Sequence, residues 1–115
     1  MRAIALAFRG EVTDARLDVA LGHVDVDVLP LETTVHGMTR VYGSGAAMDL
    51  ARDARRGLRP VMGRRFRAMR ESVRVEDDVA QVGMQLVGEG GAGRVELRLE
   101  KREDRWLVRS VSVSR

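Results

Sequence analysis

The stretch Arg94-Val-Glu-Leu-Arg-Leu-Glu-Lys101 alternates between charged and apolar side chains from Arg94 to Glu100. Alternation with a period of two is typical of a β-strand with one buried and one wet face, so Val95, Leu97 and Leu99 are expected to point inward. The sequence around it continues in the same way and predicts three or four long antiparallel strands joined by acidic turns. The further strands are expected at Arg64–Val75, Val79–Val87 and Trp106–Val113, with turns at Glu76–Asp78 and Glu103-Asp104.

The first half of the chain is expected to be mainly helical. Apolar residues recur at helical spacing in three segments, Arg2–Phe8, Asp14–His23 and Ala46–Arg56. Ser44 is a good N-cap for the third segment, and Gly57 is a natural C-terminal cap. The glycine-rich run Gly88–Gly93 is expected to form a loop between two strands.

Two short segments between the helices are less regular. Val24–Leu29 changes its period to two, and in a strand Asp25 and Asp27 would share one face. Glu32–Tyr42 is expected to form one short strand or an irregular pair of strands. Trp106–Val113 is partly apolar on both faces, which predicts a position in the middle of the sheet or at a second interface.

This order of elements predicts a single α+β domain over residues 1–115, with the helices on one face of a curved sheet. The other face of the sheet is expected to carry too many apolar residues to be left wet. A homodimer that forms through the sheet is therefore also expected.

The composition excludes several classes of protein. The 115 residues are 44% hydrophobic and 32% charged, which is ordinary for a globular domain. The absence of cysteine excludes disulfide scaffolds, thiolate zinc sites and cysteine nucleophiles, and two histidines leave little for a metal cage. No cofactor and no metal are therefore expected. No apolar run approaches the roughly 20 residues of a membrane helix, and Met1–Arg9 is too short for a signal peptide, so a cytoplasmic location is expected.

Arginine supplies nearly all of the positive charge, since Lys101 is the single lysine. This bias is a habit of GC-rich genomes, but the arginines are also clustered. The segment Arg52–Arg74 holds nine arginines against Asp53 and Glu71, and such a block could bind phosphates, RNA or an acidic partner. Because only Phe66 is interleaved with these arginines, stacking platforms for single-stranded nucleic acid are scarce, which argues against a nucleic-acid partner.

Three stretches carry a resemblance to a known family. The first is Gly10–Val28, with a glycine, a helix and an acidic exit into a strand. The second is Tyr42–Met48, which is similar to the opening of the third helix in that family. The third is Asp77–Val113, with Asp77-Asp78-Val79-Ala80-Gln81-Val82 near its start and Arg102-Glu-Asp-Arg-Trp-Leu-Val108 near its end. Together these stretches resemble the NTF2-like superfamily, which includes SnoaL-like polyketide cyclases and ketosteroid isomerases.

The resemblance implies an NTF2-like cone, in which three N-terminal helices pack on a strongly curved antiparallel sheet around a deep pocket, often in a dimer. It does not imply a reaction, because this fold hosts many functions. In the isomerase branch an Asp after the second helix removes a proton while a Tyr and a protonated acid hold the oxyanion. Asp25 or Asp27 lies in the right neighbourhood for that base, but the Tyr and the second acid have no match here. Both aspartates could equally be solvated charges.

Six residues are candidates for a site. Asp27 and His36 could act as a catalytic base or acid, although a lone histidine in a short strand is more often structural. His36 shares strand parity with Arg40 and Tyr42, so these two could contact a ligand. Met84 and Trp106 could line the pocket, although packing in the core explains both equally well.

The sequence therefore favours a domain that binds a small apolar molecule in a conical pocket and could turn it over by cofactor-free acid/base chemistry as an isomerase, cyclase or hydrolase. Whether it is an enzyme stays open. The alternative is a non-catalytic interaction module, in which Arg52–Arg74 and the sheet face bind protein or nucleic acid.

Overall fold

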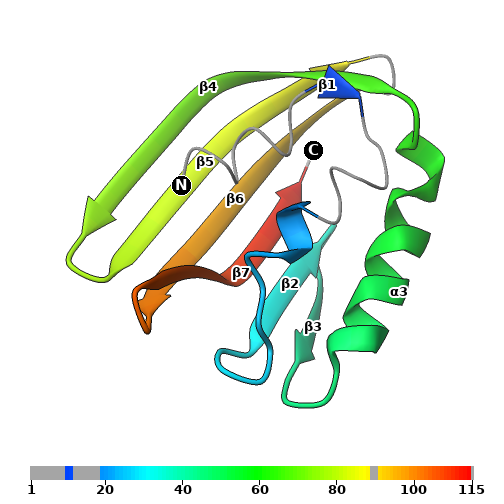
Figure 1. Cartoon of the computed structure of the whole chain (residues 1–115). Coiled ribbons are helices and arrows are strands. Elements are labelled where there is room, and N and C mark those ends of the chain that lie inside the picture. Colours follow the sequence, from blue (N-terminus) through cyan, green and yellow to red (C-terminus); the bar gives the residue numbers. More distant parts are fainter. Residues whose placement is uncertain (1–9, 12–18, 89–90, 115) are drawn as a thin grey trace.

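The computed structural model describes residues 10–11, 19–88 and 91–114, and it confirms the predicted α+β class. One long helix lies beside a broad sheet (Figure 1). In the described part of the chain, no helix is long and apolar enough to cross a membrane. The elements are β1 (Gly10–Glu11), β2 (Leu31–Val35), β3 (Met38–Tyr42), α3 (Ala47–Leu58), the 3-10 turn η1 (Arg59–Val61), β4 (Arg65–Glu76), β5 (Val79–Gly88), β6 (Gly91–Arg102) and β7 (Arg105–Ser114).

Six strands of five residues or more form one mixed sheet, and the two-residue β1 extends it at one edge in the order β1-β4-β5-β6-β7-β2-β3. The predicted strands after Arg64 are all present as the antiparallel series β4 to β7. The prediction of a wholly antiparallel sheet is wrong, because β2 pairs with β7 in parallel. The chain crosses through α3 from the β2–β3 hairpin to the far edge of the sheet, and the series then returns with β7 running in the direction of β2 (Figure 1).

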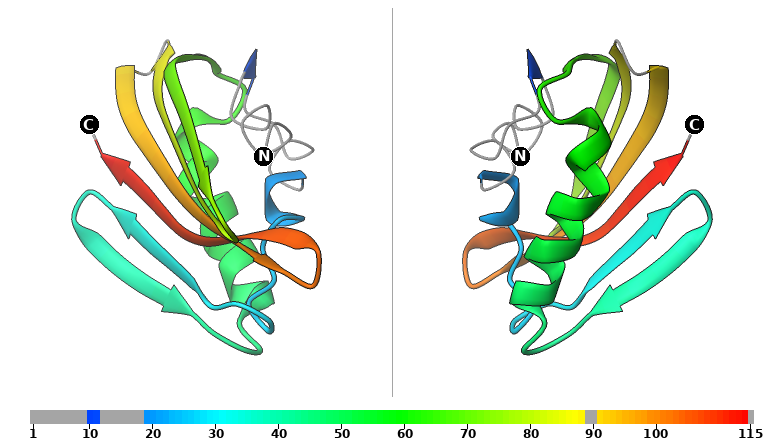
Figure 2. Two further views of the ribbon diagram at one scale, coloured as in Figure 1. Left: turned by 90° about the vertical axis from the view of Figure 1, so that its left-hand side faces the viewer. Right: turned by 90° about the vertical axis from the view of Figure 1, so that its right-hand side faces the viewer.

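The predicted layer of three helices is reduced to one long helix in the residues that the structure describes. The expected helix Arg2–Phe8 lies outside these residues, and of Asp14–His23 residues 19–23 lie within them, helical at 19–21 and in a turn at 22–23. The third expected helix is present as α3, which lies on one face of the sheet (Figure 2). The sheet bends, but it lacks the strong curl that the resemblance implied (Figure 2).

Both predicted caps of α3 are wrong. The N-cap is Ala46 without a side-chain hydrogen bond, and the hydroxyl of Ser44 instead donates to Asp27. Gly57 lies inside the helix, which ends at Leu58 and continues into η1. Pro60 is accommodated there because the first turn of a helix needs no backbone donor at that position.

The segment Val24–Leu29 forms turns and not the extended run that its period of two indicated. Oδ1 of Asp25 accepts a hydrogen bond from the amide of Asp27 at 3.2 Å, and the carbonyl of Asp25 accepts the amides of Val28 and Leu29. Aspartate favours this kind of local turn because its short side chain can bond to the backbone two residues on. Asp25 and Asp27 therefore do not share the face of a strand.

The core lies between α3 and the inner face of the sheet. Its buried apolar residues alternate along β5 and β6, and Val95, Leu97 and Leu99 all point inward as predicted, while the adjacent Leu107 and Val108 of β7 are both buried. The strand β7 lies between β6 and β2, which confirms the expected position in the middle of the sheet. The loop expected at Gly88–Gly93 is shorter than predicted, because β5 reaches Gly88 and β6 begins at Gly91.

Candidate functional site

The two predicted acid/base residues lie in different turns. Asp27 is exposed, and its Oδ1 accepts hydrogen bonds from the amide of Gly45 at 2.8 Å and from the hydroxyl of Ser44 at 3.1 Å. These bonds tie the turn before α3 to the turn after residue 24. His36 is exposed at the tip of the β2–β3 hairpin, where its φ is 50° and its amide donates to the carbonyl of Val113. The Asp27 side chain therefore joins two turns, whereas the bond at His36 is made by its backbone.

Tyr42 and Arg40 both contact Asp53, a residue that the sequence analysis did not propose for a site. The hydroxyl of Tyr42 donates to Oδ2 of Asp53 at 2.8 Å, and Nη1 of Arg40 lies 3.5 Å from the same oxygen. Asp53 stands on α3 and also faces Arg52. This cluster fastens the helix to the edge strand β3. Because Asp53 lies eleven residues beyond Tyr42, no local motif could have indicated the pair.

The pKa values of the two bonded groups move apart. The hydrogen bond from Tyr42, helped by Arg52 and Arg40, lowers the pKa of Asp53 below its ordinary 3.8. Burial and the bond to Asp53 raise the pKa of the Tyr42 phenol above its ordinary 10.0. The stabilisation from Asp53 is therefore present above pH 3.8 and is lost as the pH falls through its lower folded value, whereas that from Tyr42 is lost as the pH rises beyond 10.0.

Replacing Tyr42 with Phe is expected to lower the free energy of unfolding at pH 7 by about 1–2 kcal/mol, because one hydrogen bond to a charged group disappears. The variant should also lose less stability than the wild type when the pH falls below about 4. Urea unfolding at several pH values measures both effects. Arg40→Gln is the control: it removes an exposed ion pair and should cost less than about 0.5 kcal/mol. If Tyr42→Phe lost as much stability at acid pH as the wild type, the hydrogen bond would not be the cause of the lowered pKa of Asp53.

The two predicted pocket residues belong to the core region. Met84 on β5 has 0% of its surface exposed. Trp106 on β7 is half-buried and packs against the same cluster of apolar side chains. Neither lines either of the two hollows described next.

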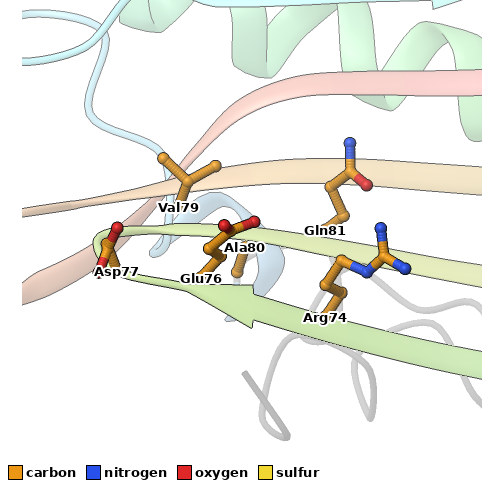
Figure 3. A pocket seen from close by; sticks show the side chains of 6 residues that line it. All are labelled: Arg74, Glu76, Asp77, Val79, Ala80 and Gln81. Carbon is orange, nitrogen blue, oxygen red and sulfur yellow. The ribbon is translucent and has the colours of Figure 1, made fainter.

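Two open hollows lie at the strand ends. One, of about 270 Å³, is lined by Asp78, Lys101, Glu103 and Asp104 and is therefore mostly acidic. The other, of about 360 Å³, lies at the β4–β5 turn and is lined by Arg74, Glu76, Asp77, Val79, Ala80 and Gln81 (Figure 3). Arg74 and Gln81 lie side by side there from neighbouring strands (Figure 3). Both hollows are open to solvent and are lined mainly by charged residues or by charged and apolar residues together, unlike a closed apolar pocket. Among the residues that the structure describes, no three His, Cys, Asp or Glu side chains gather to hold a metal.

The outer face of the sheet, away from α3, is rich in arginine. Strand pairing places Arg74 beside Gln81 and Gln81 beside Arg98, so the two arginines flank a glutamine. Their backbones lie about 10 Å apart across three strands. Arg94 and Arg67 extend the group along β6 and β4, and all four are exposed. We call Arg67, Arg74, Arg94 and Arg98 the arginine face.

Only part of this charge is compensated within the described residues. Nε of Arg94 lies 2.9 Å from Oε1 of Glu96 on the same strand. A Cβ added to Gly83 would lie 3.4 Å from Nη2 of Arg94, so this guanidinium lies over the neighbouring strand. Arg67, Arg74 and Arg98 have no ion pair with any described residue. The face therefore carries positive charge that is available to a partner.

A second group of charges forms ion pairs within itself at the other end of this face. Glu100 lies 2.8 Å from Nη2 of Arg102 and 2.7 Å from Nη1 of Arg109. The hydrogen bond from Arg102, supported by Arg109, lowers the pKa of the Glu100 carboxyl below its ordinary value. One carboxylate thus pairs with two guanidiniums, which leaves a charge of +1 but gives each of these arginines a partner.

The basic segment Arg52–Arg74 does not form one surface. Its first arginines lie on α3 and η1, and its last ones on β4. The arginine face combines Arg67 and Arg74 of β4 with Arg94 and Arg98 of β6, which lie twenty or more residues later in the chain. The basic segment found in the sequence did not include Arg94 and Arg98, although the alternation in Arg94–Lys101 already predicted that both point to the outer side.

The outer face of the sheet is mainly polar. The homodimer was expected because this face should be too apolar to stay exposed to water, and the structure does not show such an apolar face. Gln, Ser and charged residues fill most of its positions on β4 to β7, with Met69, Val79, Val87 and Leu107 as apolar exceptions. The homodimer itself stays a prediction.

No protein-family model and no curated protein matches the sequence. Solved structures do match it. A DUF4783 family protein from Bacteroides ovatus ATCC 8483 is 11% identical with a TM-score of 0.73, over 98% of this chain and 92% of that one. A cystatin-like protein of unknown function from Nostoc punctiforme PCC 73102 is 13% identical with a TM-score of 0.68, over 96% and 84%. An NTF-2 like protein of unknown function from Shewanella oneidensis MR-1 is 15% identical with a TM-score of 0.62, over 99% and 88%.

At these identities the likeness concerns the fold alone. It bears out the resemblance read from the sequence, and the chain has an NTF2-like, cystatin-like α+β fold.

Proposed function

We propose that the chain is a non-catalytic interaction module that binds an acidic protein surface through the arginine face. The observation that carries this proposal is the placement of Arg67, Arg74 and Arg98 on one side of the sheet without an ion pair to any described residue. Such a group attracts a partner of opposite charge and orients it during encounter.

The character of the face favours a protein over a nucleic acid. The arginines are interspersed with Glu96, which a phosphate backbone would meet unfavourably but a partner lysine would complement. Met69 and Val87 are exposed on the same side, and arginine and methionine are both enriched in protein interfaces. Exposed aromatic rings, on which bases could stack, are missing from the described part of this face.

The small-molecule function stays a prediction. Its candidates Asp27, His36, Met84 and Trp106 lie in two turns and in the core region, and do not converge on either open hollow.

The test uses the full chain and a fluorescent poly-glutamate peptide, with binding measured by anisotropy across a range of salt concentrations. We expect saturable binding that weakens with salt. The double variant Arg67→Glu/Arg98→Glu should weaken it by about tenfold or more, because two attractive contacts become repulsive.

The control is Arg56→Glu/Arg59→Glu, which changes the net charge equally at exposed positions on α3 and η1. It should retain binding within about twofold. Equal losses in both variants would show attraction to net charge alone and would overturn the proposal. Tighter binding of a DNA duplex than of poly-glutamate would overturn the choice of a protein partner.

A further inference from the structure

The edge of β4 beyond β1 carries a further inference, which shares only Arg74 with the arginine face. β1 pairs with β4 only at Arg65 and Phe66. A bulge then interrupts β4 between Met69 and Ser72, with Arg70 at a φ of 52°. Beyond the bulge, Ser72–Glu76 pairs with β5 on one side and with no described strand on the other. Its outward backbone groups can therefore pair with another strand.

Two valines on this edge lie on the inner side of the sheet, which carries the core, and are nevertheless exposed. Val73 and Val75 pair with Val82 and Ala80, which are both buried in the core. Val73 and Val75 are nevertheless 56% and 55% exposed. A further strand alongside β4 would cover apolar surface that the described residues leave open.

The charges on the edge complement themselves. Arg74 and Glu76 lie two residues apart and therefore share the outer face, on either side of Val75 in the chain. Both are exposed and neither has an ion pair with a described residue. An antiparallel copy of the same segment reverses the order of the two charges. Natural edges often repel copies with like charges, but this one presents one charge of each sign.

We propose that a second copy of this chain pairs with β4 in antiparallel fashion, about a two-fold axis at Val75. In this register Val75 faces Val75 of the second copy. Arg74 faces Glu76 of the second copy, and the reverse pair repeats on the other side of the axis. Opposite charges directly across two antiparallel strands stabilise the pairing, and apolar residues do the same. The two sheets then form one continuous sheet with both helical layers on the same side.

Charge selects this register. A shift by one residue in each copy places Arg74 against Arg74 of the second copy, where like charges repel. The contact is isologous, so it closes at two copies and does not propagate into a fibre. Because the pairing involves few residues, the dimer is weak and depends on concentration.

Sedimentation velocity over roughly a hundredfold range of protein concentration tests the pairing without any acidic ligand. The wild type should shift from monomer toward dimer as the concentration rises. Arg74→Glu alone and Glu76→Arg alone should each stay monomeric, because each places two pairs of like charges across the axis. A mixture of the two single variants should form heterodimers, and the double swap Arg74→Glu/Glu76→Arg should restore the homodimer.

Two kinds of control exclude an effect of net charge and an effect of unfolding. Arg59→Glu and Glu32→Arg change the net charge equally at exposed sites away from β4 and should dimerise like the wild type. Circular dichroism checks that each variant is folded, and amide hydrogen exchange at Ser72–Glu76 should slow as the concentration of the wild type rises. A monomer at every concentration would overturn the proposal, as would a dimer that ignores the charge swaps. Neither result bears on the binding of poly-glutamate, which Arg67→Glu/Arg98→Glu tests separately.

Discussion

Replacing Met84 with Ala is expected to lower the free energy of unfolding by about 3 kcal/mol, within the usual range for buried methionines. Met84 has no exposed surface and lies on β5 among the buried side chains of the neighbouring strands. The change removes apolar atoms from a close-packed core and leaves a cavity that the surrounding strands cannot fill. Urea unfolding should show a lower midpoint with an unchanged dependence on denaturant concentration.

Met48→Ala is the matched control, since the same atoms are removed from a side chain on α3 that is 86% exposed. Its effect should stay within about 0.5 kcal/mol. The pair also tests the earlier prediction that Met84 lines a ligand pocket. If Met84→Ala left the stability unchanged, Met84 would line a cavity and the description of a filled core would be wrong.

Replacing Gly88 with Ala is expected to lower the free energy of unfolding by about 3 kcal/mol. Here an atom is added where there is no room, whereas Met84→Ala removes atoms and leaves a cavity. A Cβ at this position would lie 2.3 Å from the carbonyl oxygen of Arg65 and 2.9 Å from Cδ1 of Phe66. The carbonyl belongs to the backbone of β4 and cannot rotate away, so the paired ends of β4 and β5 must separate. Loss of stability should be accompanied by faster hydrogen exchange at Arg65 and Phe66.

Gly57→Ala provides the comparison. Gly57 lies inside α3, where an added Cβ meets nothing within 4 Å. The alanine should raise stability by about 0.5–1 kcal/mol, because it restricts the unfolded chain and favours the helix. Equal effects of the two substitutions would show that close approach at Gly88 is not the cause.

The strands of the second half were predictable because their local pattern agrees with their tertiary environment. Arg94–Glu100 alternates between charged and apolar residues, and the structure buries Val95, Leu97 and Leu99 while Arg94, Glu96 and Arg98 stay exposed. The turns at Asp77-Asp78 and Glu103-Asp104 also lie where acidic residues interrupt the alternation. Val24–Leu29 shows the limit of this reasoning, because the side chain of Asp25 bonds to the local backbone and turns the chain in spite of the pattern.

The candidate site was less predictable than the fold. His36 and Tyr42 share parity in the sequence, but the hairpin places His36 at an exposed tip and Tyr42 against α3. The partner of Tyr42, Asp53, comes from another element. The arginine face likewise joins residues of β4 and β6 across β5. The two strands are too far apart in the sequence for a local pattern to indicate that their arginines share one face.

Local chemistry therefore accounts for the α+β class, the long antiparallel strands and the side of each strand that faces the core, because alternation and turn residues act over a few neighbouring positions. The parallel pairing of β2 with β7, the bond between Tyr42 and Asp53 and the free edge at Ser72–Glu76 depend on how distant elements pack. Strand order and contacts between elements arise from burying one shared core, and that burial is a property of the whole chain and of no single segment.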